Sequence, residues 1–88
     1  MDDRVVVTLH CKGCDEDYEL PCNVPLSELY PRLLSALQKH AYSDFCSYKG
    51  IILELNNRGL TDLSATLMDY GICDGSVLSV AKEEKYYG

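Results

Sequence analysis

The sequence has no tryptophan and a single phenylalanine among its 88 residues. Leucine, valine, isoleucine and tyrosine must therefore supply the side chains of any hydrophobic core. The sequence also has no apolar stretch long enough to cross a bilayer, so we expect no insertion into a membrane. A chain of this length forms one domain with one modest core, which leaves little room for a deep catalytic cleft.

Basic residues are also scarce, because 8 lysines and arginines stand against 14 acidic residues and give a formal net charge of −6. Nucleic acids and anionic membrane surfaces are bound by clustered lysine and arginine, and here these residues are scattered. We therefore expect neither as a partner. The acids cluster at residues 2–3, 15–17 and 83–84, where they keep a domain soluble or attract a basic protein over a distance.

The five cysteines are an odd number, which favours reduced thiols over a framework of disulfides. The amino terminus is acidic and lacks the charged-then-apolar order of a signal peptide, so we expect a cytoplasmic protein. Cys11 and Cys14 form a Cys-x-x-Cys pair, which is half of a tetrahedral zinc site or a candidate redox pair. No second pair supplies the other ligands, and three acids follow the motif. The sequence predicts no metal and no cofactor, and a zinc or thiol site at this pair stays open as an alternative.

Hydrophobic periodicity predicts an α+β domain. Residues 5–11 and 18–22 alternate in the manner of strands, and residues 12–17 between them form a turn that contains three acids. Apolar residues recur every three or four positions from residue 26, which predicts a helix over residues 26–40. Pro31 falls inside this helix, so we expect an irregular first turn. The later elements are, in order, a loop at 41–49, a strand at 50–55, a turn at 56–59, a very short strand that begins at 60, a connection with a short helical turn at 62–70, and a last strand at 77–81.

This order of elements is that of the ubiquitin-like β-grasp fold, in which a mixed sheet of four to five strands packs on one helix. Neither the helix nor the sheet can bury its apolar side alone, so the helix must cover one face of the sheet. The sequence thus predicts one ubiquitin-like domain at residues 1–82. The polar residues 83–88 form a flexible tail in this prediction.

The second half of the chain resembles the C-terminal part of ubiquitin. The match consists of Thr66-Leu67-Met68-Asp69-Tyr70-Gly71-Ile72, a turn, and Val77-Leu78-Ser79-Val80. In that family the tyrosine closes a turn through its hydroxyl. The resemblance therefore implies a structural role for Tyr70.

The first half resembles the YukD/EsaB proteins and the related cytosolic ubiquitin-like domains on membrane subunits of type VII secretion systems. Their pattern is Leu-Pro, two residues, Val-Pro, two residues, Glu-Leu, one residue, Pro, two residues, Leu, and it runs here from Leu20 to Leu34. The family ending Gly-Ile, one residue, Asp-Gly, two residues, Leu runs from Gly71 to Leu78. The resemblance implies a bacterial accessory protein of type VII (WXG-protein) secretion, which acts in the cytoplasm by binding a protein component of the apparatus. An excised cytosolic domain of a membrane secretion subunit stays open.

A protein modifier or sulfur carrier is an alternative of another class. Such proteins act through a C-terminal Gly-Gly, whose lack of side chains lets the tail enter a narrow enzyme channel. This chain ends Lys85-Tyr86-Tyr87-Gly88, which does not fit that channel. No Ser-His-Asp arrangement, paired carboxylates or phosphate loop stands out, and we interpret His10 and His40 as structural or solvated. The sequence therefore predicts no enzyme and no catalytic residue.

Strand alternation predicts a docking surface on the face of the sheet that points away from the helix. Ubiquitin docks partners on the corresponding face, around an exposed aliphatic residue of the third strand, so the resemblance implies Ile52 as the centre. Ordinary solvated surface is the alternative interpretation of the same face. The side chains predicted to lie on this face are Val6, Thr8, His10, Ile52, Glu54, Ser79 and Ala81.

Overall fold

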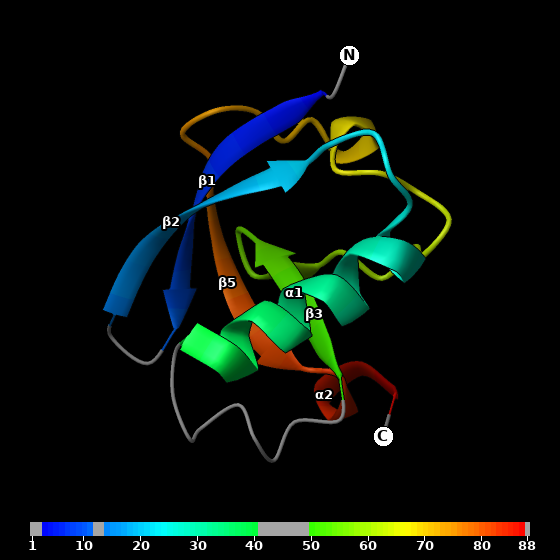
Figure 1. Ribbon diagram of the computed structural model, residues 1–88. Helices are drawn as coiled ribbons and strands as arrows, with labels where there is room; N and C mark the ends of the chain where they lie inside the picture. The colour runs from blue at the N-terminus through cyan, green and yellow to red at the C-terminus, as the bar shows by residue number, and fades with distance from the viewer. Residues whose placement is uncertain (1–2, 12–13, 41–49, 88) are drawn as a thin grey trace.

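The computed structural model describes residues 3–11, 14–40 and 50–87 of the chain. These residues form one five-stranded sheet with the strand order β2-β1-β5-β3-β4. Helix α1 lies across one face of the sheet (Figure 1). The elements are β1 (Arg4–Cys11), β2 (Cys14–Pro21), α1 (Leu26–His40), β3 (Ile51–Leu55), β4 (Arg58–Gly59), the 3-10 helix η2 (Met68–Tyr70), β5 (Val77–Lys82) and α2 (Glu84–Tyr87).

The first and last strands lie side by side near the centre of the sheet. β1 pairs in parallel with β5, with Thr8 opposite Val77. The other pairings are antiparallel, and in them β2 flanks β1 and β3 flanks β5. A mixed sheet of this order under a single main helix is the β-grasp fold, so the predicted fold class is confirmed.

The second strand differs from the prediction at its start. β2 begins at Cys14, so Asp15, Glu16 and Asp17 lie in the strand and not in a turn. Composition argues against a strand here, because aspartate has a low strand propensity. Pairing overrides it, since β1 extends to Cys11 and offers a hydrogen-bonding partner along the whole length of β2. Residues 12–13 of the predicted turn lie outside the described residues.

Leucine dominates the core between α1 and the sheet. Val7, Leu53 and Leu78 from the sheet and Leu26 from the helix are fully buried. Tyr30 is the large aromatic residue among them, and its hydroxyl donates to the carbonyl of Leu60 at 2.6 Å. A core of this kind agrees with the shortage of phenylalanine and tryptophan.

Helix α1 spans the predicted residues and runs through Pro31. The first amides of a helix have no hydrogen-bond acceptor within the helix itself. In α1 the connection between β4 and η2 supplies acceptors for two of these amides. Leu26 donates to the carbonyl of Ala65 at 2.9 Å and Ser27 donates to that of Leu63 at 3.0 Å. Pro31 is the sixth residue of α1, so the helix lacks the one hydrogen bond that an N–H at this position would donate to the carbonyl of Ser27. The connection and the start of the helix therefore hold each other in place.

Tyr70 lies at the end of η2, and its hydroxyl accepts a hydrogen bond from the amide of Asp62 at 3.1 Å. Thr66 and Asp69 exchange hydrogen bonds between side chain and amide at 3.0 and 3.1 Å. The left-handed φ of Gly71, +77°, then ends the short helix. The contact of Tyr70 closes the connection into a turn, which is the role that the resemblance implies for this side chain.

The end of the chain has more structure than its polar composition indicates. Residues 84–87 of the predicted flexible tail form the one-turn helix α2, which comes directly after β5 (Figure 1). No helix in the described part of the chain is both long and apolar enough to span a membrane.

Candidate functional site

The candidate site is the face of the sheet opposite α1, which we call the outer face. Strand alternation brings residues from all five strands onto one surface. The structure divides this surface into an open half on β1, β2 and the start of β5, and a covered half on β3, β4 and the end of β5. The open half consists of Val6, Thr8, His10, Asp15, Asp17, Glu19 and Val77, and the covered half of Ile52, Glu54, Gly59 and Ala81.

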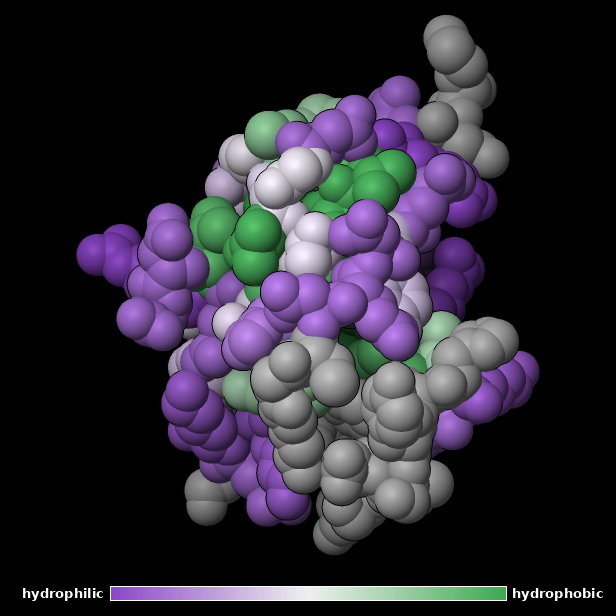
Figure 2. Space-filling view, turned by 90° about the vertical axis from the view of Figure 1, so that its left-hand side faces the viewer, coloured by the Kyte–Doolittle hydropathy of each residue, from purple (hydrophilic) through white to green (hydrophobic). Residues whose placement is uncertain are grey.

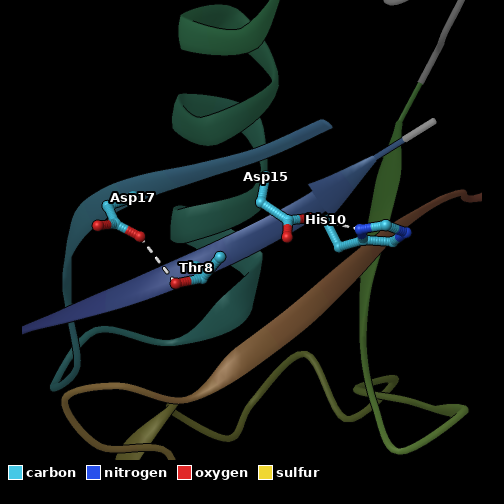
Figure 3. Close-up of polar contacts among 4 residues, drawn as sticks. All are labelled: Thr8, His10, Asp15 and Asp17. Atoms are coloured by element: carbon cyan, nitrogen blue, oxygen red, sulfur yellow. Dashed lines mark hydrogen bonds and ion pairs between the residues drawn. The ribbon is translucent and has the colours of Figure 1, made fainter. Parts of the chain in front are cut away.

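Polar pairs cross the open half from β1 to β2. The Thr8 hydroxyl donates to an Asp17 carboxylate oxygen at 2.7 Å, and His10 Nδ1 lies 2.5 Å from an Asp15 carboxylate oxygen. Figure 3 shows these four side chains on the two paired strands. β2 is an edge strand, so its carboxylates form an acidic border along one side of the outer face.

Two valines form the apolar part of the open half. Val6 is 43% exposed and Val77 is 56% exposed. Val77 pairs with Thr8 across the parallel strands, and Val6 is the next outward residue along β1. Viewed from the left of Figure 1, the surface carries small hydrophobic areas separated by hydrophilic side chains (Figure 2). The open half is therefore a small apolar centre beside a row of acids.

The covered half contradicts the predicted exposure. Ile52 is 1% exposed and Glu54 is 9% exposed, so the expectation of an exposed patch centred on Ile52 is wrong. Strand alternation is correct for both residues, because each points away from α1. At Glu54 and Gly59 the reason is that Lys85 and Tyr86 of α2 contact these two positions, which the sequence pattern of single strands does not reveal.

Helix α2 is attached to the covered half through two contacts with Glu54. The ammonium of Lys85 lies 2.7 Å from a Glu54 carboxylate oxygen, and the Tyr86 hydroxyl donates to the same oxygen. The hydrogen bond from Lys85, and then that from Tyr86, hold the pKa of Glu54 below its ordinary value. The same carboxylate raises the pKa of Lys85 and that of Tyr86 above theirs.

The Tyr86 ring also needs the absence of a side chain at Gly59. A Cβ atom built on Gly59 would lie 2.6 Å from the ring, which is closer than van der Waals contact permits. Tyr86 is half-buried and packs against the core cluster. The sequence pattern did not reveal this use of Gly59, nor Lys85 and Tyr86 as partners of the sheet.

The structure thus separates the residues that the sequence predicts for one docking surface. Val6, Thr8 and His10 come together on the open half, while Ile52, Glu54 and Ala81 lie on the other. Ser79 pairs with both His10 and Glu54 and lies between the two halves. Val77 belongs to the open half although it was not predicted, and a signal for it exists, since it alternates with the buried Leu78. The docking role of the predicted residues remains a prediction.

A hollow on the helix side of the sheet is the other concave feature. It measures about 340 Å³ and is lined by α1, the start of β3 and Leu63. Its lining is mostly apolar or hydroxylic, with Glu83 as the charged member. Gln38 and Gly50 at its end flank residues 41–49, which lie outside the described residues. The lining described here supplies no acid–base pair for catalysis.

Metal and thiol chemistry find little support in the described ranges. Within residues 3–11, 14–40 and 50–87, no three His, Cys, Asp or Glu side chains gather as metal ligands. Cys11 and Cys14 are partners across the end of the hairpin, and the two residues between them are not described. The absence of a metal therefore stays a prediction, and a zinc or thiol site at this pair stays an open alternative.

A five-stranded β-grasp sheet with one main helix defines the class of ubiquitin-like proteins, and solved structures agree. The ubiquitin-like domain of the Mycobacterium tuberculosis type VII secretion protein EccD1 is 20% identical, with a TM-score of 0.73 over 90% of this chain and 98% of that chain. The EccD5 ubiquitin-like domain from Mycobacterium xenopi is 18% identical, with a TM-score of 0.73 over 91% and 94%. Protomer 1 of the ESX-3 core complex is 24% identical, with a TM-score of 0.64 over 90% of this chain but 16% of that chain.

The family itself is established by sequence. The family model described as "WXG100 protein secretion system (Wss), protein YukD" matches residues 4–80, and the chain belongs to this family. No curated protein matches the chain. The predicted family is therefore confirmed, and the similarity to solved structures confirms the fold.

Proposed function

We propose that this chain is a non-catalytic accessory protein of type VII secretion, which acts in the cytoplasm by docking on a protein component of the secretion apparatus. The observation that carries the proposal is membership of the YukD family over residues 4–80. The proposed role is that of a binding protein, and the family membership over the same residues supports it.

The open half of the outer face is the proposed docking surface. Val6 and Val77 supply apolar area that a partner can bury, and the carboxylates of Asp15, Asp17 and Glu19 border it. With a net charge of −6, the chain attracts a partner surface that carries basic residues around an apolar patch. The partner is therefore a protein of that surface chemistry within the apparatus.

Charge reversal of the apolar centre tests this proposal. In the double variant Val6→Asp and Val77→Asp, co-purification of the tagged full chain with the secretion apparatus from its native cell should fall at least tenfold. Both side chains are exposed, so the fold should persist, which circular dichroism and thermal melting check.

Leu63→Asp is the matched control, because Leu63 is an aliphatic residue of 39% exposure that lies outside the outer face. This control should co-purify as the unmodified chain does. Equal recovery of the double variant and the control would exclude the open half as the docking surface. Secretion that continues unchanged after deletion of the gene would exclude the accessory role.

A second candidate is that the chain is the ubiquitin-like domain of a larger secretion protein. The ESX-3 chain, in which the similar part is a small fraction of the whole, supports it. Mass spectrometry of the endogenous protein separates the two candidates. A species of 9.9 kDa supports the accessory protein, and a much larger species supports the domain.

A further inference from the structure

The covered half contains a charge that needs its cover. Glu54 is the buried charged residue of the described part of the chain. A buried carboxylate is costly unless donors satisfy it. Lys85 and Tyr86 both donate to one of its oxygens, and both come from α2. The burial and the compensation of this charge are therefore supplied by the same short segment.

The covered half also has a shape that suits an aromatic ring. Gly59 leaves the space that the Tyr86 ring fills, since a Cβ atom there would meet the ring at 2.6 Å. Gly59 is not among the glycines with a left-handed backbone, which are Gly71 and Gly75. Glycine is suited to this position because it has no side chain. We call the place that Tyr86 occupies between Glu54 and Gly59 the Glu54–Gly59 socket.

The segment that fills the socket is weakly held by its own structure. α2 has four residues, and a helix of one turn does not persist without tertiary contacts. The side chain of Lys85 is 60% exposed in its ion pair, and such pairs contribute little in water. Because α2 comes after the last strand, it can leave the socket while the five strands keep their pairing.

We propose that the Glu54–Gly59 socket is a binding site for a partner segment that presents a basic and an aromatic side chain in adjacent positions, and that α2 occupies this site in cis. The chemistry of the ligand is taken from the occupant itself, a lysine followed by a tyrosine. The site lies beyond the proposed docking surface, but β5 joins the two halves. A partner segment that displaces α2 therefore extends the docking face from β2 to β4.

The occupation of the socket by α2 sets an upper limit on the dissociation constant of this contact. A segment joined by a short linker has an effective concentration on the order of 1 mM. α2 occupies its socket at this concentration, so the same segment added as a free peptide should bind an opened socket with a Kd below about 1 mM. This range is accessible to titration by NMR.

The test uses the full chain with the double substitution Lys85→Ala and Tyr86→Ala, which opens the socket without shortening the protein. The probe is a free hexapeptide with the sequence of residues 83–88. We expect saturable shifts of the Glu54 and Gly59 amides with a Kd below about 1 mM. The unmodified chain should bind at least about twofold more weakly, because its own α2 competes at an effective concentration of about 1 mM. A hexapeptide with alanine at both positions should bind the opened chain at least tenfold more weakly.

The substitution Gly59→Ala provides a second measurement in a chain whose α2 is unmodified. The added methyl group collides with the Tyr86 ring, so the amides of Lys85 and Tyr86 should move toward their random-coil shifts. Lys39→Ala, an exposed substitution on α1, is the control and should leave them unchanged. This measurement decides the cis contact even where the double variant fails to fold.

Several results would overturn the proposal. They are the absence of saturable shifts at several millimolar hexapeptide, equal binding of the alanine hexapeptide, and shifts confined to the open half. A concentration-dependent dimer in which α2 is exchanged would assign the socket to a second copy of this chain. None of these results depends on the secretion apparatus, so failure here is distinguishable from failure of the docking proposal.

Discussion

On the open half of the outer face Val77 keeps 56% of its surface exposed, whereas on the covered half Ile52 keeps 1%. Both side chains point away from α1, and both are β-branched residues of the same sheet. The two halves also differ in their neighbours, because Lys85 and Tyr86 of α2 contact Glu54 on β3 and Gly59 on β4. Strand alternation thus determines the direction of a side chain, and the rest of the chain determines whether it meets solvent.

The largest expected effect is on stability, and it compares the two halves directly. Ile52→Ala removes buried methyl and methylene groups, so we expect the free energy of unfolding to fall by about 2–5 kcal/mol. Val77→Ala changes an exposed side chain, and its effect should stay within about 0.5 kcal/mol. Urea unfolding followed by circular dichroism measures both. Similar losses for the two variants would remove the distinction between the halves.

A smaller effect concerns pH and belongs to the covered half alone. Lys85 and then Tyr86 lower the pKa of Glu54 from its ordinary 4.5 in the folded chain. A lowered folded pKa contributes stability that is present above the unfolded pKa and is lost as the pH falls through the folded value. We therefore expect this contribution to disappear below about pH 4.5. In Lys85→Ala the Glu54 pKa, followed by carboxyl NMR, should rise toward its ordinary value.

This prediction is tested by titrating the Glu54 carboxyl group in the variant and in the unmodified chain under the same conditions. An unchanged Glu54 pKa in Lys85→Ala would mean that the ion pair does not form in solution. Tyr86→Phe keeps the ring and removes the hydroxyl, so it should raise the Glu54 pKa by a smaller amount. Asp62, whose pKa is lowered by its hydrogen bonds with Ser64, is the control carboxylate, and its titration should be the same in all three chains.

The smallest effect is expected on the open half. Thr8→Val removes the hydrogen bond to Asp17 but keeps a β-branched side chain on a strand, so stability should change by less than about 0.5 kcal/mol. His10→Ala removes an exposed pair with Asp15 and should cost less than about 1 kcal/mol. Thermal melting at low and high salt measures both. A large loss in either variant would make the polar pairs structural and would weaken their interpretation as part of a docking face.

The elements that could be predicted from the sequence are those with a strong period. The strand at β1 and the helix at α1 carry apolar residues at regular spacing along their whole length, and the structure has both. Their order and the YukD pattern then suffice for the fold, because a single helix on one sheet has few ways to bury both apolar faces.

The elements that escaped prediction depend on contacts between distant segments. β2 starts at Cys14 because β1 offers it a pairing partner. α2 forms because Glu54 and Gly59, near the middle of the chain, receive Lys85 and Tyr86 from its end. Neither interaction leaves a local period in the sequence, so a window of neighbouring residues cannot reveal it. Of the predicted site, Val6, Thr8 and His10 remain exposed or partly exposed, whereas Ile52 does not.

The parallel pairing of β1 with β5 has a consequence for how the protein is made. Thr8, Leu9 and His10 pair with Val77, Leu78 and Ser79, so the first strand gains its central neighbour only after all the elements between β1 and β5 have been synthesised. Pairing between segments so distant in sequence is slow and leaves a strand edge exposed meanwhile. We therefore expect the nascent chain to stay sensitive to proteases until β5 leaves the ribosome, and to fold in one late step.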